Sequence, residues 1–418
     1  ATAGTDNFRA GVGAGDSIVS GGDRNVVIGK NAGTALTGGD SNVAIGWEAL
    51  KTEDAHANNV AIGHAALTTQ NAGADAYNVA IGYNAGTAVT TGIRNTLLGG
   101  LAGDALTTGV DNVAVGYLSA SALTDADYNV AVGKGALSDD TKGSKSTGVG
   151  YQALSTQNFT TATDSNNTAV GYNAGSLITT GVNNTLMGTA SGDAITTGHS
   201  NTVVGSAAGT AVTTGINNVA IGYVALASAT TASDNVIVGK QAGFNITDSQ
   251  YNVGIGNNAL QSLTTGDSNV AVGHSAMYGL TTASNNTALG YNAGVAVTTG
   301  ARNVAIGSTS LDVNTTGGDN VAVGANALGA NTTASNNTGV GSAALMANTT
   351  GTFNTGLGNS AMIANTTGDN NVAVGYQSLD ANTTADNNTA IGKSALTANT
   401  TGADNTAVGK DSFQDNTT

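Results

Sequence analysis

The sequence predicts an all-β fold, a parallel β-solenoid (a β-roll) in which short coils stack along one axis. Two observations lead to this prediction. The pentapeptide Asn-(Val/Thr)-Ala-(Ile/Val)-Gly recurs along nearly the whole chain, and its alternation is typical of a β-strand. The composition, with 61 Gly, no Pro, no Cys and 4% aromatic residues, leaves little material for a mixed globular core.

Twenty-four copies of the pentapeptide set the register of the coils. They start at positions 9, 25, 42, 59, 78, 95, 112, 129, 146 and 167, and then at a constant period of 17 up to 405. Before position 167, steps of 16, 19 and 21 each occur once, and the additional segments of the longer steps should protrude as loops. With strands stacked about 4.8 Å apart, such coils predict a rod on the order of 115 Å long.

The residue preference at each position of the pentapeptide has a physical explanation. Position 5 is Gly in every copy, from Gly13 to Gly409, which predicts a corner or a close contact with another backbone. Position 1 is Asn except at Arg9 and Ser146, and stacked Asn side chains should form an amide ladder from coil to coil. The aliphatic residues of position 4 should lie in one file, as in Ile45, Ile62 and Ile221.

Positions 9 and 12 share one slot in the predicted core. Where position 9 is Leu, position 12 is usually polar, as in Leu67 with Gln70 or Leu328 with Asn331. The summed volume stays roughly constant, as a close-packed interior requires. In eight copies position 9 is Gly and position 12 is aliphatic: Gly33 with Leu36, Gly86 with Val89, Gly103 with Leu106, Gly175 with Ile178, Gly192 with Ile195, Gly209 with Val212, Gly243 with Ile246 and Gly294 with Val297.

A change of coil variety predicts a soft internal boundary. From Asn314 onward position 12 is always Asn followed by Thr-Thr, so we divide the solenoid into coils 1–302, with the compensated core and two insertions, and coils 303–418. No linker composition separates the two parts. The chain stops part-way through a repeat at Asp-Asn-Thr-Thr, and we expect it to be a piece of a longer protein.

Charge and hydropathy argue against two classes of partner. The formal net charge is −15, and the 12 Lys and Arg residues are scattered, so no basic patch for nucleic acid is expected. No run of about 18 apolar residues occurs, so we expect no membrane insertion.

No constellation of residues predicts catalysis, and we expect a protein that is not an enzyme. Asp139 and Asp140 are adjacent, but they precede Lys142 in an irregular stretch that we expect to be a solvated loop. General acid–base chemistry needs paired groups in a pocket. The four histidines fall at dispersed repeat positions, too far apart for a metal cluster: His56, His64, His199 and His274.

Calcium is the one cofactor that the sequence raises. Gly-Gly-Asp at 21–23, 38–40 and 317–319 is similar to the turns of calcium-binding β-rolls. The nonapeptide that spaces the calcium ligands is missing. We therefore predict no cofactor and keep calcium as the alternative.

Position 6 carries an aromatic column that should run along one edge of the rod. Seven of the eleven tyrosines occupy it. The column either covers a corner or packs against a neighbouring chain, or it stacks glycans, because rings with a polar tip suit each role. Its residues are Trp47, Tyr83, Tyr117, Tyr151, Tyr172, Tyr223, Tyr291 and Tyr376.

The repeat resembles those of two protein families. The strand Asn-Val-Ala-Ile-Gly at 42–46, 59–63, 78–82, 218–222 and 303–307, followed by Ala or Ser three residues after its Gly, resembles the head repeats of YadA-type trimeric adhesins. The string Asn-Thr-Ala-Leu-Gly-Tyr-Asn-Ala at 286–293 is similar to repeats of phage tail fibres that end in an endosialidase-type chaperone. The likeness covers nearly the whole chain, although adhesin head repeats are usually shorter than this one.

The resemblance implies a left-handed β-roll, three chains side by side, and attachment or display at a host surface. We therefore expect the shaft of a phage tail fibre or bacterial surface adhesin, a homotrimer at a cell or virion surface, with a host glycan or protein as its receptor. The alternative is a subunit of a self-assembling extracellular filament.

Overall fold

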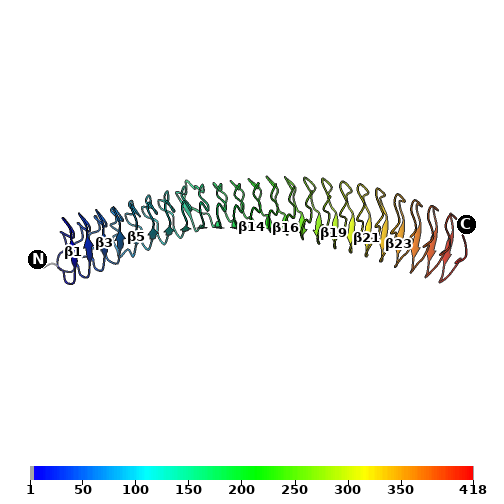
Figure 1. The fold of residues 1–418 in the computed structure, drawn as a ribbon, viewed down its shortest axis with the longest axis horizontal. Coiled ribbons are helices and arrows are strands. Elements are labelled where there is room, and N and C mark those ends of the chain that lie inside the picture. The colour runs from blue at the N-terminus through cyan, green and yellow to red at the C-terminus, as the bar shows by residue number, and fades with distance from the viewer. Residues whose placement is uncertain (1–3, 418) are drawn as a thin grey trace. The chain divides into compact units, whose positions relative to one another are not determined.

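The computed structural model describes residues 4–417, and within that range it consists of strands and turns without a helix. It forms two compact units, one ending at Thr214 and one beginning at Gly215. Each unit stacks twelve coils, and each coil contributes one three-residue strand to a parallel sheet (Figure 1). The predicted all-β solenoid of 24 coils is confirmed. No described segment forms a helix of the length and apolarity needed to cross a membrane.

The first unit contains the coil strands β1 (Phe8–Ala10), β2 (Val26–Ile28), β3 (Val43–Ile45), β4 (Val60–Ile62), β5 (Val79–Ile81), β6 (Thr96–Leu98), β7 (Val113–Val115), β8 (Val130–Val132), β10 (Thr147–Val149), β12 (Thr168–Val170), β13 (Thr185–Met187) and β14 (Thr202–Val204). A separate two-stranded pair joins β9 (Gly143–Ser144) to β11 (Thr163–Asp164). The additional residues of the two longer steps lie mostly at the surface, around 71–75 and 158–164, except Phe159, which is buried.

The second unit contains β15 (Val219–Ile221), β16 (Val236–Val238), β17 (Val253–Ile255), β18 (Val270–Val272), β19 (Thr287–Leu289), β20 (Val304–Ile306), β21 (Val321–Val323), β22 (Thr338–Val340), β23 (Thr355–Leu357), β24 (Val372–Val374), β25 (Thr389–Ile391) and β26 (Thr406–Val408). Equivalent residues pair from coil to coil, as Val304 does with Val321. The change of coil variety at 303 lies inside this unit, and the boundary there stays a prediction.

The first coil starts at Asn7, so its predicted start at Arg9 is wrong. Strand β1 pairs Arg9 with Val27, which puts Arg9 at position 3 and Gly11, with φ 128°, at position 5. The Asn25 backbone N–H donates to Asn7 Oδ1 at 2.8 Å, as in later coils. Gly11 and Gly13 both follow Arg9, and the sequence prediction took Gly13 instead of Gly11 as the glycine of position 5. The first step therefore runs from Asn7 to Asn25, and Ser146 is the one exception to Asn at position 1.

The strands turn their small side chains inward. At position 3, Ala44 and Ala61 are fully buried, whereas Val60 and Ile62 at positions 2 and 4 remain partly exposed. The side chains at positions 2 and 4 form what we name the outer strand face. Period-2 alternation normally buries the larger set of side chains. Here the larger set lies outside, and the interior is narrow.

The shared core slot is confirmed and includes position 3 as well. A Cβ atom on Gly33 would lie 2.8 Å from Leu36 Cδ1, and one on Gly103 would lie 2.8 Å from Leu97 Cδ2. Gly and large residues thus alternate among three positions to fill one volume. The five coils with a large aliphatic residue at position 3 all have Gly at position 9: Val27 with Gly33, Leu97 with Gly103, Leu186 with Gly192, Val203 with Gly209 and Ile237 with Gly243.

We expect one coil variety to be convertible into the other. Val297 is fully buried, and Val297→Asn alone should lower the free energy of unfolding by about 3 kcal/mol, because it empties an apolar slot. Adding Gly294→Leu should refill that slot and restore stability to within about 1 kcal/mol, as in the native pair Leu328 and Asn331. Urea unfolding of the two single variants and the double variant checks this. Additive losses in the double variant would contradict a shared slot.

Candidate functional site

The Asn residues of position 1 form the predicted ladder, and they use it to hold the backbone. Asn371 is fully buried, and its Nδ2 donates to the Ala385 carbonyl at 2.8 Å. Its Oδ1 accepts the backbone N–H of Asn388, one coil further on, at 2.9 Å. These amides satisfy backbone groups that would otherwise be orphaned inside the coil. They are therefore unavailable to a ligand.

The predicted close backbone contact at position 5 lies between successive coils of one chain. Gly46 has φ 136°, and a Cβ atom placed on it would overlap the carbonyl oxygen of Gly63. The same approach recurs between Gly375 and Gly392 in the second unit. Position 5 thus serves stacking within the chain.

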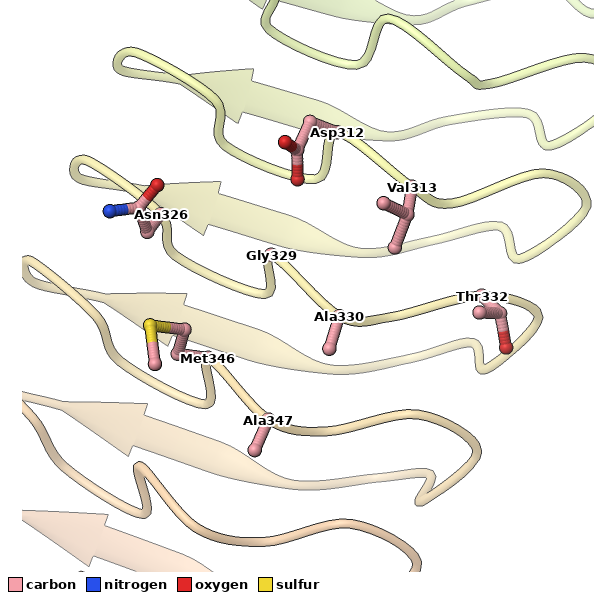
Figure 2. A pocket seen from close by; sticks show the side chains of 8 residues that line it. All are labelled: Asp312, Val313, Asn326, Gly329, Ala330, Thr332, Met346 and Ala347. Carbon is pink, nitrogen blue, oxygen red and sulfur yellow. The ribbon is translucent and has the colours of Figure 1, made fainter.

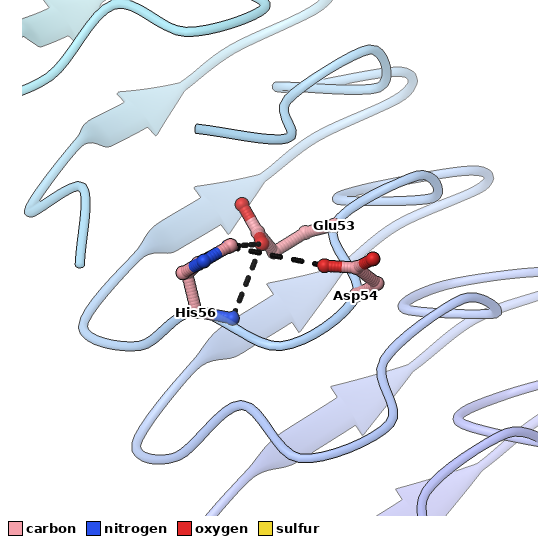
Figure 3. A group of neighbouring side chains, drawn as sticks. All are labelled: Glu53, Asp54 and His56. Atoms are coloured by element: carbon pink, nitrogen blue, oxygen red, sulfur yellow. Dashed lines mark hydrogen bonds and ion pairs between the residues drawn. The ribbon is translucent and has the colours of Figure 1, made fainter. Parts of the chain in front are cut away.

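Two acidic residues lie beside a histidine. The sequence analysis considered the histidines alone and did not predict this cluster. Glu53, Asp54 and His56 lie together on the turn after β3 (Figure 3). His56 Nδ1 lies 3.0 Å from Glu53 Oε1 and 3.8 Å from Asp54 Oδ1. Burial raises the pKa of the Glu53 carboxyl, since its side chain is fully enclosed. Oxygen and nitrogen ligands of this kind could approach a metal, but Glu53 and His56 already use these atoms in a hydrogen bond to each other.

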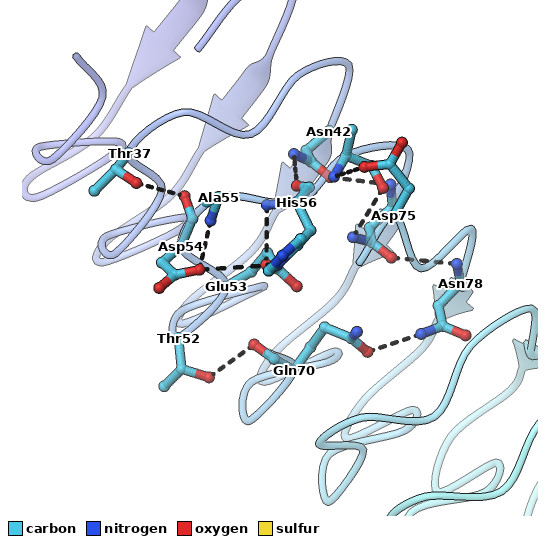
Figure 4. A network of polar contacts seen from close by, with 12 residues as sticks. Thr37, Asn42, Thr52, Glu53, Asp54, Ala55, His56, Gln70, Asp75 and Asn78 are labelled. Carbon is cyan, nitrogen blue, oxygen red and sulfur yellow. Dashed lines mark hydrogen bonds and ion pairs between the residues drawn. The ribbon is translucent and has the colours of Figure 1, made fainter. Parts of the chain in front are cut away.

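The cluster is tied into the coil-to-coil bonding (Figure 4). Asn42 Nδ2 donates to the His56 carbonyl at 2.9 Å. One coil on, Gln70 occupies the same position 12 as Glu53, and Gln70 Oε1 accepts from Asn78 Nδ2 at 2.8 Å. Glu53 and Gln70 are thus an acid and an amide at the same core position of successive coils. Their place in the interior indicates a structural role.

Asp140 is buried, so the predicted solvated loop is wrong for this residue. It sits at position 12 and points inward, whereas Asp139 at position 11 is exposed. Asp140 Oδ2 accepts from Gln157 Nε2 at 2.5 Å, and Oδ1 accepts the backbone N–H of Gly143 at 3.0 Å. Burial raises the pKa of the Asp140 carboxyl, and the hydrogen bonds to Gln157 and the backbone oppose that rise.

Asp140 predicts a pH effect of definite sign. Because its pKa is raised on folding, its contribution to stability is full at acid pH and is lost as pH rises through the folded pKa. Relative to Asp140→Asn, the parent should gain free energy of unfolding as pH falls from neutrality towards about 4. Chemical unfolding across this range measures the difference. The exposed neighbour supplies the control, since Asp139→Asn should show no such trend; a flat difference for Asp140→Asn would refute the assignment.

In each unit the position 6 residues form an exposed column, which we name the C-edge column because it follows the carboxyl ends of the strands. Its eight predicted aromatic side chains are 38–57% exposed. Neighbouring rings stack along the coil axis: Tyr151 and Tyr172 have centroids 5.1 Å apart and planes 9° apart. His64 stacks on Tyr83 with centroids 5.0 Å apart, and the Trp47 ring is tilted by 30° against His64 at 4.5 Å. Stacked rings cover one another's faces, which leaves less ring face for a sugar than the sequence suggested.

A second aromatic set lies at the opposite edge of the strands and was missed by the sequence analysis. Tyr77, Tyr128, Tyr251 and Phe353 occupy the last position of their coils and are 55–60% exposed. That position has a left-handed backbone, with φ from 52° to 61° in these four residues, which favours Asn over aromatic side chains. The available signal in the sequence was a large ring at the last position of four coils, where the left-handed backbone favours Asn. We name the last two positions of each coil the N-edge column.

The outer strand face lies between these two columns. Its side chains include Met187, Leu289 and Leu357, which are 46–48% exposed. Ten of the eleven tyrosines flank it, seven at position 6 and three at the last position. Extended apolar surface with an aromatic rim is typical of an interaction site. This surface is the strongest functional candidate in residues 4–417.

An open groove lies on a different side of the second unit. It is lined by residues of positions 7, 10, 11 and 13 from three successive coils (Figure 2). Asp312 is its one charged lining residue, and burial raises the pKa of that carboxyl. Val313 and Met346 contribute apolar surface. With a single titratable group, the groove lacks the convergent polar groups of a catalytic site.

The Gly-Gly-Asp turns use their carboxylates within the chain. Asp40 Oδ1 accepts the backbone N–H of Asp23 at 2.7 Å. Both oxygens of Asp319 accept from Arg302, at 2.6 and 2.8 Å. These aspartates therefore join successive coils, and calcium stays an untested alternative.

Comparison with known proteins identifies no relative, so the function is inferred from the sequence and the structure. No protein-family model matches the chain, and a search of curated protein sequences finds no match either.

Proposed function

We propose that this chain is a non-enzymatic structural element, the shaft of a phage tail fibre or bacterial surface adhesin at a virion or cell surface. In this proposal three left-handed solenoids associate side by side and hold a receptor-binding region away from the particle or cell. The observation that carries the proposal is the outer strand face. An apolar stripe repeated on every coil is covered along its length most simply by another copy of the same chain.

The size of this surface supports a stable association. Each of the twelve coils in a unit presents two outward side chains, one from position 2 and one from position 4. A standard protein interface uses about 20–30 residues on each side, so the outer strand face of one unit is of interface size. The aromatic residues on both edges are of the type enriched in interfaces, and many of the apolar side chains of the stripe remain substantially exposed in the single chain.

Sedimentation of the purified chain tests the proposal. The parent should form a discrete trimer, and Leu357→Lys should dissociate it, because a charge would enter the apolar interface. Both the parent and the variant should stay folded by circular dichroism, since Leu357 is 46% exposed in the single chain. Met346→Lys, on the groove side, should leave the trimer intact. A monomeric parent would refute the proposed assembly.

A self-assembling filament is the second candidate. It is favoured by the uniform register of the second unit, in which each strand pairs in parallel with the equivalent strand one repeat further on. Coils of separate chains could stack in the same way, because every coil offers an equivalent strand. Open-ended polymers of increasing mass in the same sedimentation experiment would support this candidate over a closed trimer. Contact with a host glycan or protein receptor remains a further proposal for either assembly.

A further inference from the structure

We propose that the two edge columns are docking surfaces for each other, and that they make neighbouring copies of the chain lie parallel. The C-edge column of one copy would face the N-edge column of the next. This inference rests on the proposed side-by-side assembly and adds which edges of neighbouring chains meet, which an apolar stripe alone leaves open.

The charged residues of the C-edge column are all basic. Five of the eight lysines occupy position 6, and no Asp or Glu does, in a chain with 27 acidic residues. Lys410 pairs with Asp411 at 3.3 Å. The other four form no ion pair with a described residue, and Lys134 instead approaches the ring of Tyr151 at 5.9 Å. These four are Lys30, Lys134, Lys240 and Lys393.

The N-edge column is predominantly acidic. The last two positions of the coils hold ten Asp and four Arg or Lys. Three of these aspartates form ion pairs with arginines of their own chain: Asp40 with Arg24, Asp111 with Arg94 and Asp319 with Arg302. Seven have no cationic partner among residues 4–417: Asp23, Asp127, Asp234, Asp267, Asp369, Asp386 and Asp404. Each of these seven accepts a hydrogen bond from a neutral group of its own chain. Anions without a cationic partner on one edge therefore match cations without an anionic partner on the other.

Because the basic and acidic columns lie at opposite ends of the strands, the strand direction decides which columns meet when two copies associate. All strands of a unit are parallel, so position 6 always follows the strand and the last position always precedes the next strand. If two parallel copies face each other across their outer strand faces, the C-edge of one meets the N-edge of the other. If one copy is inverted, C-edge meets C-edge and lysines face lysines. Opposite charges favour the parallel arrangement, and like charges disfavour the inverted one.

Interchain disulfide formation tests the orientation, since the chain has no natural cysteine. Lys240 and Asp234 flank the same strand, β16. Full-length Lys240→Cys mixed with Asp234→Cys should give an interchain disulfide under mild oxidation. Inverted copies whose second units overlap fully would instead bring position 6 of β16 near position 6 of β25, so a disulfide between Lys240→Cys and Lys393→Cys would overturn the proposal.

Charge exchange gives an independent readout. Lys240→Asp alone should weaken association at low salt, by roughly tenfold in dissociation constant, and Lys240→Asp with Asp234→Lys should restore it. Lysine is tolerated at the N-edge backbone, since Lys145 has φ 63° there. A double variant as weak as the single variant would overturn edge pairing while the trimer itself stood. A monomeric parent would instead refute the assembly on which the inference rests.

Discussion

Replacing Gly46 by alanine is expected to destabilise the first unit by about 3–6 kcal/mol. Two costs add at this position. The backbone has φ 136°, which residues with a side chain rarely adopt, and the new Cβ atom would overlap the carbonyl oxygen of Gly63 in the next coil. The coils would have to separate locally. Chemical unfolding and amide hydrogen exchange around β3 and β4 measure the effect.

Gly38 provides the matched control, in the turn that precedes β3. A Cβ atom on Gly38 meets no heavy atom within 4 Å, and its backbone lies outside the left-handed region. Gly38→Ala should therefore change the free energy of unfolding by no more than about 0.5 kcal/mol. Equal effects at the two glycines would show that the approach of successive coils is not what position 5 requires.

The second large effect is expected at the Asn ladder. Asn371→Leu would remove the acceptor of the Asn388 N–H and the donor to the Ala385 carbonyl, and both backbone groups are enclosed. Each buried group left unpaired costs about 1–3 kcal/mol, so the variant should lose about 2–6 kcal/mol. Urea unfolding of the second unit checks this value.

An exposed asparagine in the preceding coil tests whether burial is the cause. Asn359 lies at position 6 of its coil, and Asn359→Ala should leave the free energy of unfolding within about 0.5 kcal/mol of the parent. If Asn371→Leu were equally mild, the ladder would contribute little, and the coils would depend on backbone pairing and the apolar slot alone.

The repeat period was sufficient to predict the solenoid, the strand positions and the shared slot, because each coil can bury apolar surface only against its neighbours. It could not predict which side of the strand is inside. Alternation alone is symmetric, and the usual expectation that larger residues face inward fails here because the interior accommodates Ala44 but leaves Val43 and Ile45 outside. The volume available inside is a property of the whole coil.

The candidate surface was only half predicted. The aromatic residues after the strand stood out because they share position 6, whereas Tyr128 and Tyr251 before the strand occupy a position that is polar in most coils. Asp140 was placed in solvent because its neighbours in sequence are polar. Its repeat position was the better guide, since position 12 points inward in other coils as well, as at Gln70 and Asn331.

The uniform register has a consequence for how such a protein can vary. In the second unit each strand pairs with the equivalent strand one repeat further on, and every junction uses the same bonds. Deleting or duplicating one repeat-length block would recreate an equivalent junction at the splice. Unequal recombination between tandem copies of the gene segment could therefore shorten or lengthen the molecule stepwise without redesigning its interior.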